Sequence, residues 1–426
     1  MDINPKNIDF IDLYRHDDIR RLAFLGDRYP DVDLTWSLEQ IAGWQTACRK
    51  LPTWAATTGL VYPPHLSMEQ CSSEVTACYK RAIMDSVMAD HDKAKISQQH
   101  PSGAGWQLVD LTGGFGVDFS FMAPLFEQAI YVEQQAALCE TARHNFPLLG
   151  LSHAKVVCGD STEQLNALTP HEHRVIFLDP ARRDRHGSRT YALGDCTPDV
   201  LQLREKLLEK SEWLLLKLSP MLDWHKAVAD LEDGDVADGL HTVRQIHIVS
   251  VQNECKELLL LLSRKHRGCQ QVCCTNDGQT FAFDPKEAAT IREQFSDFSD
   301  KGGNDWNGQY LYEPNASVMK AGCFALLQQR YNVVAIGANS HLFISPDEID
   351  DFPGRRFVIQ AVFTMNKKDM KQELSGVERA NIAVRNFPLS APELRKKLHL
   401  SDGGNIYIFA TTTAQRNHLL LLCKKG

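Results

Sequence analysis

The sequence predicts an α/β protein built on an open, mainly parallel sheet, with a helical region before it and a small α+β module after it. Between residues 106 and 263, short apolar runs alternate with helix-like stretches, a rhythm typical of parallel strands joined by helical crossovers. The last two runs are separated only by Gln252 to Glu257. Because that gap is too short for a crossover helix, these two runs should form an antiparallel hairpin.

Seven apolar runs make up this predicted sheet. The five parallel strands are expected at Gln107 to Leu111, Ala129 to Glu133, Ala154 to Cys158, Val175 to Leu178 and Trp213 to Leu218, and the hairpin at Val243 to Val251 and Leu258 to Leu262. In open α/β sheets, ligands bind beyond the carboxyl ends of the strands. The residues that follow these runs are therefore the candidates for a functional site.

The segments on either side of the sheet differ from it in pattern. Residues 1 to 96 have apolar positions at helical spacing and no strand alternation, which predicts a helical N-terminal region. A less regular segment begins near residue 264, and after residue 308 a helix is predicted near Ala316 to Tyr331, with strands at Phe357 to Thr364 and Asn405 to Thr412. The predicted domains are a helical region at 1–96, a sheet domain at 97–268, a small connecting, ferredoxin-like segment at 269–309, and an α+β module at 310–426.

Composition excludes several classes of protein. The chain has 426 residues, of which 43% are hydrophobic and 23% charged, as in globular proteins of two or three domains. No apolar run reaches the roughly 18 to 20 residues that span a bilayer, and the charged start is unlike a signal peptide, so we expect a cytoplasmic protein with no membrane contact. The twelve cysteines are dispersed and should be reduced thiols. Cys269, Cys273 and Cys274 lack a second ligand pair at zinc-site spacing, so no metal is expected.

The charge distribution leaves room for a local basic surface. The net charge of −8 argues against non-specific nucleic-acid binding by the whole molecule. The last quarter of the chain nevertheless carries the basic groups Arg355-Arg356, Lys367-Lys368, Arg395-Lys396-Lys397 and Lys424-Lys425. A solvated lysine-rich surface is the commoner explanation of any one of them.

A glycine-rich turn follows the first predicted strand. That strand ends in Asp110, and Gly113, Gly114 and Gly116 precede a helix that starts near Asp118. Glycines let the backbone pass close to a ligand, and a helix N-terminus offers free N–H groups, so the turn fits a nucleotide-like ligand. Such a turn also occurs in NAD enzymes, which need a small residue at position 119 for close packing of helix on strand. The residue here is Phe119, which disfavours pyrophosphate binding.

Acidic residues at three successive strand ends favour S-adenosyl-L-methionine as the cofactor. Asp110 is placed to meet the amino group of the ligand, with Thr112 and Asp118 beside it. Glu133, at the second strand end, could accept hydrogen bonds from both ribose hydroxyls. Asp160 and Ser161, at the third, could contact the adenine. Each carboxylate alone could be an ordinary surface group, but three in this order make that reading much weaker.

The fourth strand ends in Asp179-Pro180-Ala181-Arg182-Arg183, next to the point where strand order reverses. Asp179 and the backbone carbonyl of Pro180 could hold a planar amino group, and positioning supplies most of the catalysis in methyl transfer. We therefore predict Asp179, Pro180 and Arg182 as catalytic residues. Predicted substrate contacts are Arg183, Lys217 and Ser219, with Tyr79 and Lys80 from the segment before the sheet.

Several motifs resemble known methyltransferases. DLTGGFG (110–116), YVE (131–133), GDS (159–161) and DPAR (179–182) occur in the order found in class I methyltransferases. SMEQCSSEVTACYK (67–80), LKLSPMLD (216–223), YLYEPNASVMKAG (310–322) and NSHLF (339–343) are similar to a bacterial methyltransferase family with a C-terminal THUMP-like domain. The resemblance implies a Rossmann-like, seven-stranded class I methyltransferase sheet and a THUMP-like domain at 310–426. It also implies that the partner is RNA, either tRNA or rRNA.

The motifs also depart from familiar patterns. Methyltransferases that act on base amino groups commonly carry an aromatic residue after the Asp-Pro or Asn-Pro pair, whereas this chain has Ala181-Arg182. Another aromatic must then stack on the base, and Tyr79, Trp224 and Phe115 are candidates. RNA uracil-C5 methyltransferases need a cysteine nucleophile where this chain reads Leu218-Ser219-Pro220, so N-methylation is favoured.

The leading hypothesis from the sequence is an S-adenosylmethionine-dependent methyltransferase that N-methylates a base in RNA. Two alternatives stay open. One is a small-molecule or protein methyltransferase whose added domains cover the pocket, and the other is a non-catalytic RNA-binding scaffold. The acidic residues at the strand ends weigh against the scaffold.

Overall fold

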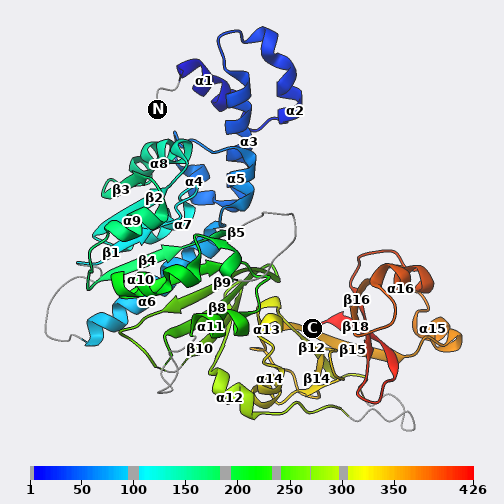
Figure 1. Cartoon of the computed structure of the whole chain (residues 1–426). Helices are drawn as coiled ribbons and strands as arrows, with labels where there is room; N and C mark the ends of the chain where they lie inside the picture. The colour runs from blue at the N-terminus through cyan, green and yellow to red at the C-terminus, as the bar shows by residue number, and fades with distance from the viewer. Residues whose placement is uncertain (1–3, 95–104, 183–192, 233–240, 269, 297–305) are drawn as a thin grey trace. The chain divides into compact units, whose positions relative to one another are not determined.

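The computed structural model describes residues 4–94, 105–182, 193–232, 241–268, 270–296 and 306–426. The chain divides into two compact units (Figure 1). The first comprises Met1–Ile246 and Lys256–Cys269, and the second comprises His247–Cys255 and Gln270–Gly426. None of the helices built from the described residues has the length and hydropathy that a membrane crossing requires.

The first unit begins with helices, as predicted. They are α1 (Pro5–Tyr14), α2 (Ile19–Leu22), the 3-10 helix η1 (Ala23–Arg28), α3 (Leu34–Lys50), α4 (Pro52–Ala56), α5 (His65–Gln70) and α6 (Glu74–Ala94). The side chains of Asn4, Asp18 and Asp33 accept hydrogen bonds from the first backbone N–H groups of α1, α2 and α3, which would otherwise lack a partner. Trp54 packs in one apolar cluster with Phe115. This cluster joins the helices to the turn that follows the first strand.

The sheet of the first unit has the predicted plan. Its strands are β1 (Gln107–Asp110), β2 (Gln128–Glu133), β3 (Ala154–Cys158), β4 (Arg174–Leu178), β7 (Trp213–Leu218), β8 (Val243–Val251) and β9 (Glu254–Leu262). They lie in the order β3-β2-β1-β4-β7-β9-β8. The first five pair in parallel and β9 pairs antiparallel with β7. This is the class I methyltransferase fold, and the strand order reverses between β1 and β4.

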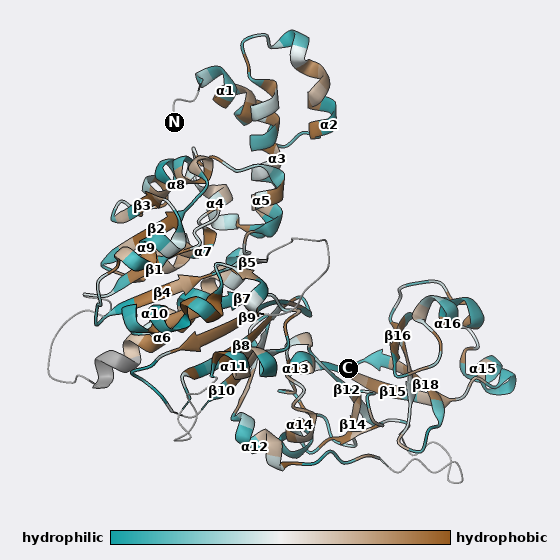
Figure 2. Cartoon of the chain, viewed as in Figure 1, coloured by the Kyte–Doolittle hydropathy of each residue, from teal (hydrophilic) through white to brown (hydrophobic). Residues whose placement is uncertain are grey.

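Helices connect the parallel strands. They are α7 (Val117–Met122), the 3-10 helix η2 (Ala123–Leu125), α8 (Ala136–Leu148), α9 (Ser161–Ala167), α10 (Val200–Lys210) and α11 (Trp224–Leu231). Figure 2 shows hydrophobic residues concentrated in the strands, whereas α10 is largely hydrophilic. All described residues of β1 and β4 are buried, as expected for strands covered on both faces. A small two-stranded ribbon of β5 (Ala181–Arg182) and β6 (Cys196–Thr197), with the 3-10 helix η3 (Leu193–Asp195) between them, follows β4 and was not predicted.

The second unit contains a hairpin and a separate mixed sheet. The hairpin strands β10 (Gln271–Asn276) and β11 (Gln279–Phe283) precede α12 (Pro285–Thr290), and β10 neighbours β8, whose last residues belong to this unit. The second sheet has the order β13-β14-β12-β15-β18-β17-β16. Its strands are β12 (Tyr310–Pro314), β13 (Val334–Ala335), β14 (Phe343–Ser345), β15 (Gly354–Phe363), β16 (Asn381–Arg385), β17 (Ile406–Thr412) and β18 (His418–Lys425). Its helices are α13 (Ala316–Ala321), α14 (Phe324–Tyr331), α15 (Lys367–Glu373) and α16 (Ala391–Leu398).

Both faces of the second sheet are buried. Along β18, Leu419 and Leu421 belong to one apolar cluster, whereas Leu420 and Leu422 belong to another. Successive strand residues point to opposite faces, so this alternation means that each face has its own core. Leu394 from α16 and Met370 from α15 join the second cluster, which places these two helices over the same face.

Two predictions for this region were incomplete. The helix expected near Ala316 to Tyr331 is two helices, because Gly322, at φ 71°, ends α13 in the left-handed region. The segment described as less regular from about residue 264 contains the β10–β11 hairpin. The strands expected at Phe357 to Thr364 and Asn405 to Thr412 are confirmed as β15 and β17.

Candidate functional site

A cavity of about 1260 Å³ lies in the first unit at the carboxyl ends of the parallel strands. Its walls come from the residues after β1, β2, β3, β4 and β7 and from the segment before α6. Ligands of doubly wound sheets bind where the strand order reverses. The predicted site residues that line it are Asp110, Thr112, Gly113, Gly114, Gly116, Asp118, Glu133, Asp160, Ser161, Asp179, Pro180, Lys217 and Ser219.

The glycine turn is held tightly against the second strand. Gly113 N–H donates to the carbonyl of Val132 at 2.8 Å, and the Tyr131 hydroxyl donates to the carbonyl of Gly114. A Cβ atom at Gly113 would lie 2.2 Å from Cε2 of Tyr131. Gly116 has φ +87°, in the left-handed region that favours glycine. The backbone geometry of this turn therefore depends on glycine at both positions.

Phe119 fills the place where a dinucleotide site needs a small residue. It is fully buried, and its ring stacks on Phe146 with centroids 5.0 Å apart and meets Tyr131 edge-on at 5.6 Å. The aromatic cluster fixes α7 against β2.

Asp110 is a buried carboxylate at the floor of the cavity. The residue is only 1% exposed, and its Oδ1 accepts a hydrogen bond from Thr112 N–H at 2.9 Å. Burial raises the pKa of Asp110 well above its usual value, and the nearby carboxylates of Asp118 and Asp179 raise it further. A cation that entered the cavity here would favour the ionised form.

Glu133 is fixed by the backbone at the end of β2. Its Oε2 accepts from Gly114 N–H at 2.9 Å and its Oε1 from Gln135 N–H at 2.8 Å. Each carboxylate oxygen has more than one acceptor site, so both could still accept a hydroxyl hydrogen from a ligand. Two neighbouring ribose hydroxyls match this arrangement.

Asp160 has a structural task of its own. Its Oδ1 accepts hydrogen bonds from Thr162 N–H at 2.8 Å and Glu163 N–H at 3.0 Å, so it caps the start of α9. Asp160 and Ser161 both line the cavity. A contact with adenine would have to use the second carboxylate oxygen.

The loop after β4 brings Asp179 and Pro180 to the same cavity. Asp179 N–H donates to Thr112 Oγ1 at 2.6 Å, which ties the loop to the glycine turn. Lys217 Nζ lies 2.7 Å from Asp179 Oδ2. Burial in the cavity wall raises the pKa of Asp179, although the Lys217 ammonium opposes this effect. Of the two arginines expected to follow, Arg182 lies in β5 and its side chain is outside the described part, as is the whole of Arg183.

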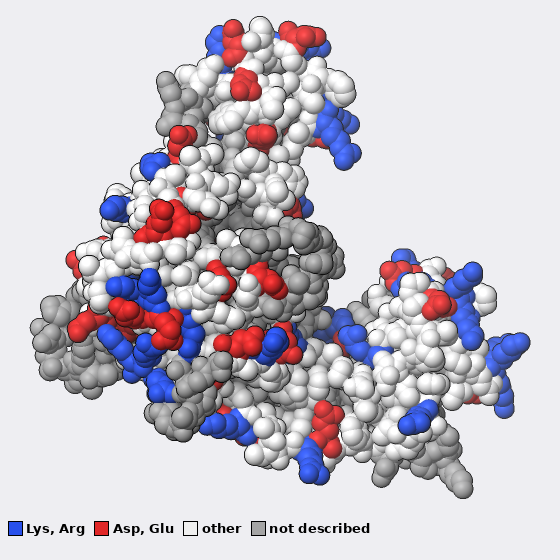
Figure 3. Space-filling view, in the orientation of Figure 1, with Lys and Arg blue, Asp and Glu red and all other residues white. Residues whose placement is uncertain are grey.

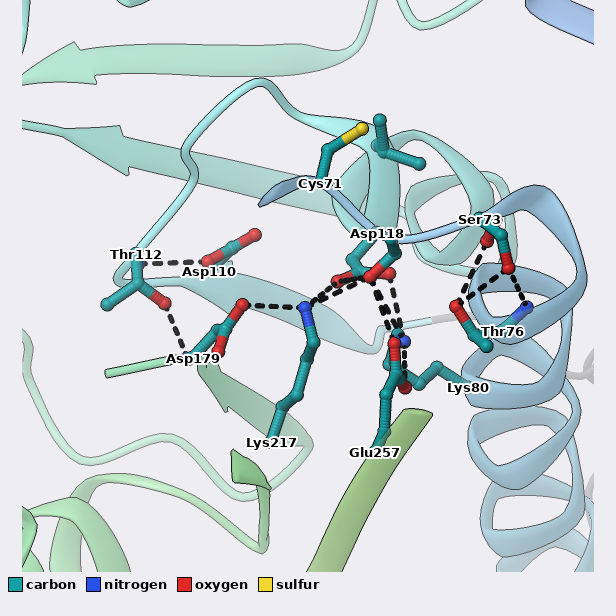
Figure 4. A network of polar contacts seen from close by, with 12 residues as sticks. Cys71, Ser73, Thr76, Lys80, Asp110, Thr112, Asp118, Asp179, Lys217 and Glu257 are labelled. Atoms are coloured by element: carbon teal, nitrogen blue, oxygen red, sulfur yellow. Dashed lines mark hydrogen bonds and ion pairs between the residues drawn. The ribbon is translucent and has the colours of Figure 1, made fainter. Parts of the chain in front are cut away.

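Six polar side chains beside the cavity form one network, drawn in Figure 4. They are Ser72, Lys80, Asp118, Asp179, Lys217 and Glu257, and we call them the lysine–carboxylate cluster. The side chain of Lys80 is fully buried, with Nζ 2.5 Å from Glu257 Oε2 and 3.1 Å from Asp118 Oδ1. The predicted substrate contact of Lys80 therefore finds no support, because its ammonium group points into the protein and does not line the cavity.

The charged groups of the cluster shift one another's pKa values. Burial alone would raise the pKa of Asp118, but the ammonium groups of Lys80 and Lys217 outweigh burial and lower it. Burial alone would lower the pKa of Lys217, but Asp118, Asp179 and Glu257 raise it well above its usual value. Lys217 is therefore a cation, and Asp118 an anion, at any physiological pH.

Sequence reasoning missed Glu257 and Ser72. Glu257 was assigned to the turn of the hairpin, and it is a buried residue in β9. The available signal was a charged residue directly before the apolar run 258–262, where a carboxylate needs a partner. Nothing local in the sequence indicates that this partner is Lys80, which is 177 residues away.

The aromatic candidates for base stacking lie in three different settings. Phe115 lines the cavity but is 6% exposed and packs edge-on against Trp54. Tyr79 is half-buried on α6 and does not line the cavity. Trp224 is buried on α11, with its ring against His225. The aromatic residues in the described cavity wall are Phe115 and Phe177, and both are almost fully buried.

The described residues contain neither a cluster of metal ligands nor a disulfide. Within them, no group of three or more His, Cys, Asp or Glu is arranged to hold a metal ion. All eleven cysteines in the described ranges are free, and Cys269 lies outside them.

Comparison with known proteins shows which families and solved structures the chain is similar to. The family described as THUMP domain-like matches residues 354–425, and a ferredoxin-like domain family matches residues 310–353. The crystal structure of a candidate methyltransferase from Porphyromonas gingivalis W83 is 30% identical, with a TM-score of 0.78, over 99% of this chain and 97% of that one. No curated protein matches the chain.

Two other solved structures are similar over a shorter stretch. An rRNA methylase from Streptococcus thermophilus is 16% identical over 37% of this chain and 86% of its own, with a TM-score of 0.27. A candidate methyltransferase from Streptococcus mutans in complex with SAH is 16% identical over 37% of this chain and 87% of its own, with a TM-score of 0.28. These two matches are too weak to assign a function.

The fold and the cavity together define a class I methyltransferase architecture. The chain belongs to the bacterial family of class I methyltransferases that carry a C-terminal THUMP-like domain, which it shares with the P. gingivalis protein.

Proposed function

We propose that the chain is an S-adenosyl-L-methionine-dependent methyltransferase that N-methylates a base in RNA, with tRNA or rRNA as the substrate. The observation that carries this proposal is the convergence of Asp110, Glu133 and Asp179 with the glycine turn on one cavity. The buried carboxylate of Asp110 suits the ammonium group of the methyl donor, and the fixed carboxylate of Glu133 suits its ribose diol. The carboxylate of Asp179 suits the methyl acceptor.

Each residue has a distinct role in binding the methyl donor. Asp110 would pair with the amino group of its methionine part, because burial makes an unpaired charge at this position costly. Glu133 would accept hydrogen bonds from both ribose hydroxyls, and Ser161 with the free oxygen of Asp160 would meet the adenine. The bound sulfonium would supply an electrophilic methyl group, and the protein would exclude water and align the acceptor.

Asp179 and Pro180 would hold the acceptor. The side-chain carboxylate of Asp179 and the backbone carbonyl of Pro180 can each accept one hydrogen of a planar amino group. Asp179 N–H donates to Thr112 Oγ1 at 2.6 Å, so the backbone of Asp179 is fixed relative to the glycine turn. Ser219 also lines the cavity.

The second unit supports RNA as the substrate class. THUMP domains in better-known enzymes present RNA, typically tRNA, to an attached methyltransferase. Exposed lysines on α15 and α16, which cover one face of the second sheet, are free of ion pairs among the described residues: Lys367, Lys368, Lys371, Lys396 and Lys397. Figure 3 shows blue side chains over these two helices. Phosphate contacts by such lysines position a nucleic acid without reading its sequence.

Transfer of a labelled methyl group from S-adenosylmethionine to RNA tests the proposal. The RNA should come from a strain that lacks the gene, so that the target base is unmodified, and nucleoside mass spectrometry should identify the product. We expect Asp179→Ala to reduce kcat by roughly 10²- to 10⁴-fold, with cofactor affinity unchanged. Asp85→Ala, which removes an exposed carboxylate on α6, is the matched control and should behave as the wild type. Absence of label in every RNA fraction would rule out RNA as the substrate.

A further inference from the structure

The lysine–carboxylate cluster draws its six side chains from distant parts of the first unit. Ser72 precedes α6, Lys80 lies on α6 and Asp118 at the start of α7, while Asp179 follows β4, and Lys217 and Glu257 lie on β7 and β9. Five ionisable groups at one site are expensive to bury, and are retained where each has partners. The cluster also reaches the cavity wall, through Ser72, Asp118, Asp179 and Lys217.

Lys217 has no hydrogen-bond donor to spare for a ligand. Its Nζ lies 2.7 Å from Asp179 Oδ2, 3.0 Å from Ser72 Oγ and 3.3 Å from Asp118 Oδ2. An ammonium group has three N–H donors, and all three are used within the protein. Lys217 therefore acts on the reaction through Asp179 and not by direct contact with the substrate.

Lys80 contacts two of the residues that hold Lys217, namely Asp118 and Ser72. Its Nζ has partners in Glu257, Asp118 and Ser72, at 2.5, 3.1 and 3.4 Å. The two lysines share Asp118, one on each carboxylate oxygen, and both donate to the Ser72 hydroxyl. Asp118 and Ser72, which hold Lys217 in place, are thus themselves fixed by the fully buried ammonium group of Lys80.

Asp179 is the exposed end of the cluster. Its side chain is 40% exposed, whereas those of Asp118 and Glu257 are 10% and 5% exposed. Lys217 occupies Oδ2, and within the described ranges Oδ1 accepts no hydrogen bond. Among the described residues, one carboxylate oxygen is therefore anchored while the other has no hydrogen-bond partner and belongs to a residue that lines the cavity.

We propose that Asp179 accepts the proton released on methylation, and that Lys217 is the positioning residue that anchors its Oδ2 and leaves Oδ1 toward the acceptor. This inference rests on the proposed function and narrows it to acceptors that present an N–H group. The acceptor nitrogen gains the methyl group while the carbon–sulfur bond breaks with its electron pair to sulfur. The N–H proton then passes to Oδ1, its bonding pair returns to nitrogen, and Asp179 later releases the proton to water in the cavity.

The charged groups around Asp179 set its proton affinity in opposing directions. Although the side chain is partly exposed, the surrounding protein removes water from the carboxylate and thereby raises the pKa of Asp179. Asp118 and Glu257 raise this pKa further, and Lys217 lowers it. Asp110 lies close enough to interact as well, and Lys80 neutralises part of the charge of Asp118. Removal of Lys217 should therefore raise the pKa of Asp179, so that the ionised, active form appears only at higher pH.

The test compares wild type, Lys217→Met, Asp179→Asn and the double variant. We expect Lys217→Met to lower kcat by about tenfold or more, since a positioned general base contributes roughly 10²- to 10⁴-fold, and to move the acidic limb of the kcat–pH profile to higher pH. The affinity for S-adenosylhomocysteine, measured by calorimetry without catalysis, should stay at the wild-type value. The double variant should be no slower than Asp179→Asn alone, because Lys217 acts only through Asp179.

Lys226→Met serves as the control, because its side chain is 63% exposed on α11 and lies outside the cluster. A wild-type kcat and an unmoved acidic limb in Lys217→Met would overturn the inference, as would fully additive losses in the double variant. If Lys217→Met does not fold, Ser72→Ala replaces it, with a reduced kcat expected and a wild-type kcat contradicting us. If the wild type labels no RNA although it binds S-adenosylhomocysteine, the proposed function fails and this inference falls with it.

Discussion

Asp110→Asn should make the protein more stable to unfolding and weaken its affinity for S-adenosylmethionine. Asp110 is almost fully buried and accepts one described hydrogen bond, from Thr112 N–H, and burial raises its pKa well above the usual value. Asparagine has nearly the same shape and keeps an acceptor oxygen, but it carries no charge at any pH. The substitution therefore isolates the effect of a buried carboxylate.

The sign of the stability change follows from proton binding. A raised pKa means that the folded state binds the Asp110 proton more tightly than the unfolded state does. Wild-type stability should then fall as the pH rises from the ordinary value of aspartate through the raised one, and Asp110→Asn should lack this fall. Each pH unit by which the pKa is raised corresponds to about 1.4 kcal/mol at neutral pH, or roughly 3 °C in Tm for a domain of this size.

Binding should change in the opposite direction. Loss of a charge-assisted contact to the ligand amino group costs about 1.5 to 3 kcal/mol, which is roughly a 10- to 100-fold weaker affinity. Thermal unfolding at several pH values and calorimetric titration with S-adenosylmethionine measure the two effects on the same samples. A variant that is less stable than wild type at pH 7, or that binds the cofactor equally well, would refute the assigned role of Asp110.

Three further substitutions probe the supports of the site and the second unit. Lys80→Met should destabilise the protein by about 3 to 5 kcal/mol in denaturant unfolding, since removal of one partner leaves buried carboxylates uncompensated, while Lys226→Met should have almost no effect. Gly113→Ala should cost about 1 to 3 kcal/mol because its Cβ would overlap the Tyr131 ring, and should weaken cofactor binding, whereas Gly194→Ala meets no atom within 4 Å and should be neutral. Burial lowers the pKa of His247 to about 4, so the second unit should lose about 3 kcal/mol between pH 6.5 and pH 4. His247→Gln should remove that loss, and an identical pH dependence in both proteins would contradict it.

The sequence was sufficient for the features that depend on local pattern. Apolar runs of strand length, separated by crossover helices, predicted the first sheet and its hairpin. Asp110, Glu133 and Asp179 could be recognised because each directly follows or ends a predicted strand, and parallel strands end at one edge of the sheet. Their convergence on one cavity required no knowledge of side-chain packing.

The β10–β11 hairpin was missed although its signal was present. Asp277 and Gly278 form the turn, both with positive φ, and an Asp-Gly pair between two β-prone runs is among the strongest hairpin signals. The lysine–carboxylate cluster could not be predicted from local pattern, because Ser72 and Glu257 are hydrogen-bonded although they are 185 residues apart in the sequence. Tertiary packing alone decides which buried lysine meets which carboxylate.

Binding of the methyl donor is the most direct measurement of the central claim, that the cavity at the β1–β4 switch point is a site for S-adenosylmethionine. Calorimetric titration of the full chain should show saturable one-to-one binding of S-adenosylmethionine. It should show no binding of NAD, since the bulky Phe119 stands where a dinucleotide site needs a small residue. A folded protein that binds no S-adenosylmethionine, or that binds NAD instead, would contradict the claim.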